Sequence, residues 1–219
     1  MARVAEMTGR AHWVIGACAA VPVAMLAGDP LALFVCGVAG IVGGLLPDID
    51  HPGSTLGRHA PWPSVTETNE HTGFVAHGRR WFGGHVVWHR GETHSLGAAG
   101  LAFGVTTLGL WWPVLSFEGW AQHKGFMPVV GLPAAPWLIA GAFAGWIGSA
   151  VFLGYLSHLV ADLVNISPQM LWWPFSRRMV HIPGWHGVAE RSTAGRWVER
   201  LAMWGALLAA WAMWAPRPW

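Results

Sequence analysis

The sequence of 219 residues is 53% apolar and only 11% charged, which argues against an ordinary water-soluble domain. The formal net charge is +2 and the arginines are scattered, which argues against nucleic acid as a partner. Cys18 and Cys36 lie in apolar segments without C-x-x-C spacing, so we expect neither a disulfide framework nor a cysteine zinc site. Seventeen tryptophans against one tyrosine indicate amphipathic side chains at a boundary between lipid and water.

Five apolar stretches approach the length of a membrane-spanning helix, which is roughly 20 residues for a hydrocarbon core of about 30 Å. The first two are separated only by Asp29 and Pro30, as in a tight helical hairpin. The fifth is short, and its tryptophans are expected to anchor it at the interfaces. We therefore predict an all-α fold, with a single domain over residues 1–219 built as a polytopic membrane helical bundle of about four to five transmembrane helices. The expected spans are residues 13–28, 31–47, 96–115, 136–160 and 201–215.

The basic residues predict an orientation for this bundle. If the amino terminus is cytoplasmic, all Lys and Arg residues except Lys124 and Arg217 fall on the cytoplasmic side. This asymmetry is what the positive-inside rule describes. A competing interpretation is a cleaved signal peptide, because Arg3 and Arg10 precede an apolar run that ends near Ala27. The run continues almost at once into a second apolar segment, which favours the hairpin.

Two features bear on packing and loops. The stretch 52–88 is rich in Pro, Gly, Ser and Thr, so we expect a cytoplasmic loop there, with or without a short interfacial helix. Glycines within the apolar segments could let helices approach closely, and they include Gly37, Gly40, Gly44, Gly141 and Gly145.

The predicted topology places ionisable side chains at the cytoplasmic ends of four spans. These side chains are His12 at the first span, Asp48, Asp50 and His51 at the second, His89, Arg90, Glu92 and His94 before the third, and His158 and Asp162 at the fourth. Ionisable groups near membrane depth are costly and need a partner or a function, and metal coordination supplies both.

The spacing of these residues is informative. His158 and Asp162 are four residues apart, so on a helix they share one face and can hold one ion or bridge two. Mixed imidazoles and carboxylates suit zinc, manganese or iron. The plainer interpretation is that Asp48 and Asp50 end a helix in solvent and that His158 is a hydrogen-bonded interfacial histidine.

Three motifs in this order resemble the bacterial inner-membrane metal-dependent hydrolase family, which includes a LexA-regulated member. The motifs are P-D-I-D-H at 47–51, H-R-G-E-T-H-S at 89–95 and G-Y-L-S-H-L-V-A-D at 154–162, and L-W-W-P-F-S at 171–176 extends the likeness. The stretch 165–170 departs from the glycine-containing turn that the family would have there. The resemblance implies a bacterial inner-membrane location and the metal ligands His12, Asp48, Asp50, His51, His89, His94, His158 and Asp162.

These ligands are more than one tetrahedral ion needs, which makes two ions a reasonable hypothesis. We therefore expect one or two divalent ions, with zinc preferred and manganese or iron as alternatives. Such ions would activate water for hydrolysis, Arg90 would stabilise an anionic transition state, and Glu92 would shuttle a proton. A site at the cytoplasmic interface points to a membrane lipid or a lipid-linked phosphoester as substrate.

The alternative function is a metal-binding membrane scaffold or transporter without catalysis. A transport path needs polar residues at mid-bilayer depth, and the span centres 99–110 and 139–151 contain almost none. The scaffold therefore remains the stronger rival, and the oligomeric state cannot be inferred from the sequence.

Overall fold

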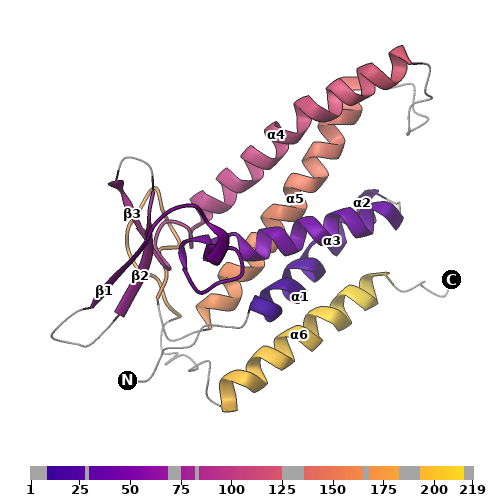
Figure 1. The fold of residues 1–219 in the computed structure, drawn as a ribbon. Coiled ribbons are helices and arrows are strands. Elements are labelled where there is room, and N and C mark those ends of the chain that lie inside the picture. The colour runs from indigo at the N-terminus through magenta and orange to yellow at the C-terminus, as the bar shows by residue number, and fades with distance from the viewer. Residues whose placement is uncertain are drawn as a thin grey trace.

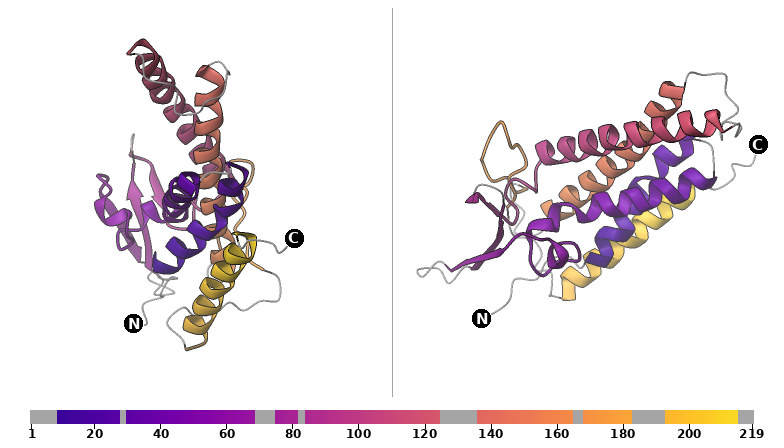
Figure 2. Two further views of the ribbon diagram at one scale, coloured as in Figure 1. Left: turned by 90° about the vertical axis from the view of Figure 1, so that its right-hand side faces the viewer. Right: turned by 45° about the horizontal axis from the view of Figure 1, so that its top comes forward.

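The computed structural model describes residues 9–27, 30–68, 75–81, 84–124, 136–164, 168–182 and 193–214. Its helices are α1 (Gly9–Ala19), α2 (Val21–Ala27), α3 (Pro30–Leu45), α4 (Leu96–His123), α5 (Pro136–Leu163) and α6 (Thr193–Trp214). Helix α5 is central, since α4 packs against one side of it, α3 and α1 pack against the other, and α6 lies beyond α1 (Figure 1). A small sheet lies at one end of these helices, and this end carries the candidate site (Figure 2).

Two described helices have the length and hydropathy of a membrane span, Leu96–Phe117 in α4 and Gly141–Leu163 in α5. Only 6% of the first window is buried inside the protein, against 44% of the second. The expected spans 13–28 and 31–47 correspond to shorter apolar helices, Ala11–Leu26 and Leu31–Leu45. Helix α6 covers most of 201–215 and begins with charged turns, and it is not among the spans found in the described residues. A topology of four or five crossings therefore stays a prediction.

The first apolar segment is divided, where the sequence suggested one continuous helix. Helix α1 ends at Ala19 and α2 begins at Val21. Pro22 explains the break, because proline has no N–H to donate and its ring clashes with the carbonyl four residues earlier. The predicted turn at Asp29 lies outside the described residues, but α2 and α3 pack against each other as a hairpin requires.

Glycines allow close approach where α1, α3 and α5 meet. A Cβ atom on Gly43 would overlap the carbonyl oxygen of Val151 in α5, and one on Gly154 would overlap the carbonyl of Gly40. The buried cluster beside this contact is made of small and medium side chains, which are Ala20, Val23, Ala24, Cys36, Ala39, Ala150 and Val151. Small residues at helix contacts let backbones approach within a membrane, as the sequence suggested for Gly40.

The expectation of an all-α fold is wrong in one segment. Strands β1 (Ser64–Thr68), β2 (Val75–Arg80) and β3 (Val86–Trp88) form an antiparallel sheet in the order β1-β2-β3 inside the stretch 52–88, which we expected to be a loop. The stretch contains short runs of β-branched residues, but its many Pro and Gly residues favoured the prediction of a loop. The pairing of such short strands depends on tertiary context.

Arg79 fixes the sheet to the preceding turns. This buried side chain on β2 donates hydrogen bonds to the carbonyl oxygens of Gly57 and Trp62. At the other edge of β2, the amide of His89 donates to the carbonyl of His77 at 2.8 Å. The sheet thereby sets the position of His89, one of the expected ligands.

The glycine contact between α3 and α5 predicts a position-specific loss of stability. Gly43→Ala should lower the free energy of unfolding by about 1–3 kcal/mol, because the added methyl group must displace the backbone of Val151. Gly37→Ala on the same helix is the matched control, since a Cβ there meets nothing within 4 Å. Thermal unfolding in detergent would measure both, and equal behaviour of the two variants would contradict the packing.

Candidate metal centre

Three segments bring four buried ligand side chains together. Asp48 lies in the 3-10 turn η1 (Pro47–Asp50), where Pro47 follows the end of α3. His94 precedes α4, whose first turn is capped because the Ser95 hydroxyl accepts the amide of Ala98 at 3.0 Å. His158 and Asp162 lie one turn apart on α5. All four residues are less than one-tenth exposed.

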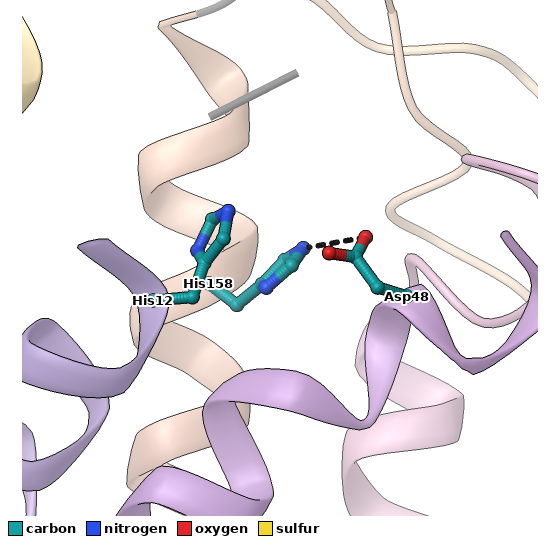
Figure 3. Close-up of side chains that lie close together, drawn as sticks. All are labelled: His12, Asp48 and His158. Atoms are coloured by element: carbon teal, nitrogen blue, oxygen red, sulfur yellow. Dashed lines mark ion pairs between the residues drawn. The ribbon is translucent and has the colours of Figure 1, made fainter. Parts of the chain in front are cut away.

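The two imidazole nitrogens lie close to each other and to both carboxylates. His94 Nε2 lies 3.3 Å from His158 Nε2, 3.5 Å from Asp48 Oδ1 and 3.4 Å from Asp162 Oδ2. His158 Nε2 lies 3.5 Å from both carboxylate oxygens, and Figure 3 shows its approach to Asp48. Zinc bound at about 2.0–2.1 Å by a tetrahedral set separates its ligand atoms by about 3.3–3.4 Å. The five observed separations, 3.3–3.5 Å, are close to this value.

Hydrogen bonds on the outer nitrogens orient both imidazoles for coordination. His158 Nδ1 donates to the carbonyl of Gly44 at 2.7 Å. The Thr93 hydroxyl donates to Asp50 Oδ2, so its oxygen is left to accept from His94 Nδ1 at 3.3 Å. With a proton on each Nδ1, the two Nε2 atoms present lone pairs to each other and to the carboxylates. Partners of this kind fix the tautomer of metal-ligating histidines.

Asp50 lies behind the ligands and accepts hydrogen bonds from His89 and Thr93. Its Oδ1 accepts from His89 Nδ1 at 3.0 Å, and its Oδ2 accepts from Thr93. His89 would therefore bind an ion through Nε2, in the carboxylate–histidine–metal arrangement. The structure gives Asp50 an orienting position, while His89 joins Asp48 and His94 in a group whose ligand atoms lie within 4.8 Å of one another.

His12 enters the site from α1. Its ring stacks on His158 with 3.8 Å between centroids (Figure 3). Its Nδ1 is buried and has no hydrogen-bond partner among the described residues. His12, Asp48 and His158 form a further group within 4.8 Å, and His94, His158 and Asp162 form the third. Six of the eight expected ligands thus belong to one continuous cluster.

Arg90 is buried beside the cluster. Its Nη2 lies 3.6 Å from Asp162 Oδ2, and its backbone has a φ of 63°. A non-glycine residue in this left-handed region is uncommon and indicates a constrained position. Although burial raises the pKa of Asp48, His158 and His94, when either is protonated on the nitrogen that faces the carboxylate, hold that pKa well below its usual value. Asp48 is thus a carboxylate, ready to bind a cation.

Besides Asp50 and Arg90, two more expected site residues, His51 and Glu92, lie outside the three ligand groups. The His51 Nδ1 accepts the amide of Gly53 at 3.2 Å, and the ring packs against His77 and His89. Glu92 pairs with His85 at 3.3 Å, and His85 is largely exposed. Glu92 therefore lies between the buried segment 93–95 and solvent.

Sequence analysis missed two supporting residues. Thr93 orients His94 and contacts Asp50, and the Tyr155 hydroxyl donates to the carbonyl of Thr93. Both residues stand inside motifs that had been noted only for their ligands. A signal was present for Tyr155, since it is the only tyrosine in the chain and precedes His158 by three residues, which places it on a similar helix face.

The donor set fits a divalent cation. Asp48, Asp50 and Asp162 are buried, and the buried guanidinium of Arg90 lies beside Asp162. Three carboxylates and one guanidinium leave a charge of −2 if the imidazoles are neutral, which a divalent ion would balance. Imidazoles and carboxylates with Nε2 lone pairs turned inward are ligands suited to zinc, manganese or iron.

Comparison with known proteins supplies the family. Over 145 residues the chain is 34% identical to the inner membrane protein YdjM of Escherichia coli K12, and its match to YdjM of Shigella flexneri is the same. The aligned part covers 66% of this chain and 48% of each relative, so the chain spans about half the length of these curated relatives. No solved structure matches the chain. The YdjM family profile matches residues 7–217, and the chain therefore belongs to the YdjM inner membrane protein family.

Proposed function

We propose that this protein is a membrane-bound metal-dependent hydrolase that acts at the cytoplasmic membrane interface. The observation that carries the proposal is the convergence of His94, His158, Asp48 and Asp162 in a buried site, where each Nε2 lies 3.4–3.5 Å from both carboxylates. Perturbed, buried ionisable groups with oriented tautomers are typical of functional sites.

The ligand groups divide naturally between two ions. The group of His12, Asp48 and His158 and the group of Asp48, His89 and His94 share only Asp48. A carboxylate has two oxygens and can bridge two ions, whereas a neutral imidazole binds one ion through one nitrogen. Asp162, one turn beyond His158, would complete the first set. Asp48 is therefore the residue on which a dinuclear centre would depend.

The residues of the three ligand groups would hold divalent ions, which when bound would supply activated water and a Lewis acid for the phosphoryl oxygen of the substrate. The chain's own residues would orient the ligands, stabilise the transition state and carry away the proton. Asp50 and Gly44 hold His89 and His158 in the ligating tautomer. The Arg90 guanidinium is available to an anionic transition state beside Asp162. Glu92, paired with the exposed His85, passes the released proton toward solvent.

The substrate class follows from the position of the site. The ligands lie at the start of α4 and the end of α5, which are the two helices with the character of membrane spans. A lipid headgroup can reach such a site without drawing its acyl chains into water. We therefore propose a phospholipid or another lipid-linked phosphoester.

One observation favours the non-catalytic scaffold as the second candidate. Both imidazoles lie within 3.5 Å of both carboxylates, and a single ion bound by all four would have no open position, as in structural zinc sites, whereas catalytic sites keep one. A single ion held by these four residues would tie η1, the start of α4 and the end of α5 together. The number of ions per chain therefore separates the two candidates.

Purified protein should contain about two zinc, manganese or iron atoms per chain by elemental analysis. Asp48→Ala should lose most of this metal, because Asp48 belongs to both groups, and His158→Ala should lose about half or more. His59→Ala is the control, since His59 is an exposed histidine outside the groups and should retain the full content. One ion per chain would favour the scaffold, and metal-free, well-folded wild type after reconstitution would rule out both candidates.

Thr93→Val should weaken metal binding without removing a ligand. The substitution keeps the shape of the side chain but deletes the hydroxyl between Asp50 and His94, and the loss of such a partner typically costs about 10–100-fold in affinity. Thr93→Ser retains the hydroxyl and should bind metal nearly as tightly as wild type. Competition with a chromophoric chelator would measure the affinities, and equal affinity of the valine variant would contradict the orienting role.

Hydrolysis should be tested in lipid vesicles. Wild type should release a phosphorylated or dephosphorylated headgroup from phospholipid vesicles, chelation should abolish the release, and added metal should restore it. Arg90→Gln should lower the rate by about 10²–10³-fold at unchanged metal content, because it removes a charge that acts on the transition state. Metal-loaded, folded protein without activity on any phosphoester lipid would leave the scaffold as the better account.

A further inference from the structure

The loop 168–182 follows the end of α5 and is held closely to the metal-bearing end of the protein. Its base is closed by an antiparallel bridge, in which Gln169 and Val180 exchange backbone hydrogen bonds at 3.0 and 2.8 Å. Inside the bridge, the amides of Phe175 and Ser176 both donate to the carbonyl of Trp172 at 3.0 Å, which folds the tip into a tight turn. The loop is therefore compact.

Hydrogen bonds join this loop to α5, to Arg90 and to the first turn of α4. The carbonyls of Leu171 and Trp173 accept the amides of Leu96 and Gly97, in the first turn of α4. The amide of Met170 donates to the carbonyl of Arg90 at 3.0 Å. The buried Gln169 side chain donates to the carbonyl of Leu159 on α5 at 2.8 Å. The loop thus keeps a fixed place beside the start of α4.

The tip of the loop exposes large apolar side chains, whose contact with water is unfavourable. Phe175 is 94% exposed and Trp172 is 51% exposed, and Met179 and Ile182 are also exposed. Arg177 and Arg178 are exposed between them. Aromatic side chains flanked by arginines are typical of segments that rest in the headgroup region of a bilayer.

The position of α4 sets the depth of this tip. The window Leu96–Phe117 has 22 residues, about 33 Å of helix, which matches a hydrocarbon core of about 30 Å. If α4 crosses the bilayer, its first turn lies at headgroup level, and the loop bonded to that turn lies there too. The arginines would then face lipid phosphates of the same membrane.

We propose that loop 168–182 binds anionic phospholipid headgroups, with Phe175 and Trp172 inserted at the interface and Arg177 and Arg178 paired with lipid phosphate. The loop is thereby an anchor that holds the end of the protein carrying His94 and His158 at headgroup level. This binding surface is separate from the ligand cluster and does not depend on hydrolysis.

Native mass spectrometry of the full chain in detergent would test the lipid preference. Wild type should retain phosphatidylglycerol over phosphatidylcholine of the same acyl chains, and Arg177→Gln with Arg178→Gln should weaken phosphatidylglycerol binding by about 10–30-fold. Arg58→Gln with Arg80→Gln removes the same charge from exposed positions elsewhere and should leave the preference unchanged. No preference in wild type, or an equal loss in both double variants, would overturn the proposal.

A spin label would test insertion directly and does not depend on the arginine variants. In a Cys18→Ala, Cys36→Ala background, a nitroxide on Phe175→Cys in nanodiscs containing phosphatidylglycerol should be more accessible to oxygen than to a water-soluble nickel complex. A label on Thr66→Cys, exposed on β1, should show the reverse. Equal water accessibility at both positions would exclude insertion. Neither measurement involves metal or turnover, so failure here is distinguishable from failure of the proposed hydrolase.

Discussion

The hydrogen bond from His158 to the carbonyl of Gly44 joins the packing of the helices to the chemistry of the site. It forms only because α3 and α5 approach closely at Gly43, Val151, Gly40 and Gly154. The same bond keeps a proton on Nδ1 and turns the other nitrogen toward His94 and two carboxylates. Helix packing and ligand orientation are thus one constraint, and a shift of α5 against α3 would disturb both.

Charge is the second constraint on this end of the protein. The facing Nε2 atoms of His94 and His158, 3.3 Å apart, cannot both carry protons without opposing N–H dipoles. Protonation of one of the two therefore balances only part of the charge of the buried carboxylates. A divalent cation accepts both lone pairs and balances the carboxylates together, which is why a metal explains the geometry better than a cluster of histidine–aspartate ion pairs.

The sequence predicted which ionisable side chains gather better than it predicted the fold. The spacing of His158 and Asp162, and the placement of ionisable residues at the ends of apolar segments, brought six expected ligands into the observed cluster. The sheet was not predicted because strand pairing is set by contacts between segments distant along the chain. The helix break at Pro22 was not predicted because the apolar run continues on both sides of the proline. The sequence pattern also could not show that Asp50 orients other side chains. An aspartate that binds an ion and one that supports a ligand look the same in sequence, and only the structure shows that the Asp50 oxygens face His89 and Thr93.

The distribution of polarity along α4 and α5 bears on the choice between the proposed functions. Between Leu96 and Phe117 there is no Asp, Glu, Lys or Arg, and the ionisable residues of α5 are confined to its last two turns. A carrier needs polar groups where its substrate crosses the bilayer, and these helices concentrate them at one end. A lipid already presents its headgroup at that level. The positions of the charged residues therefore agree better with a reaction at the membrane interface than with transport across the bilayer.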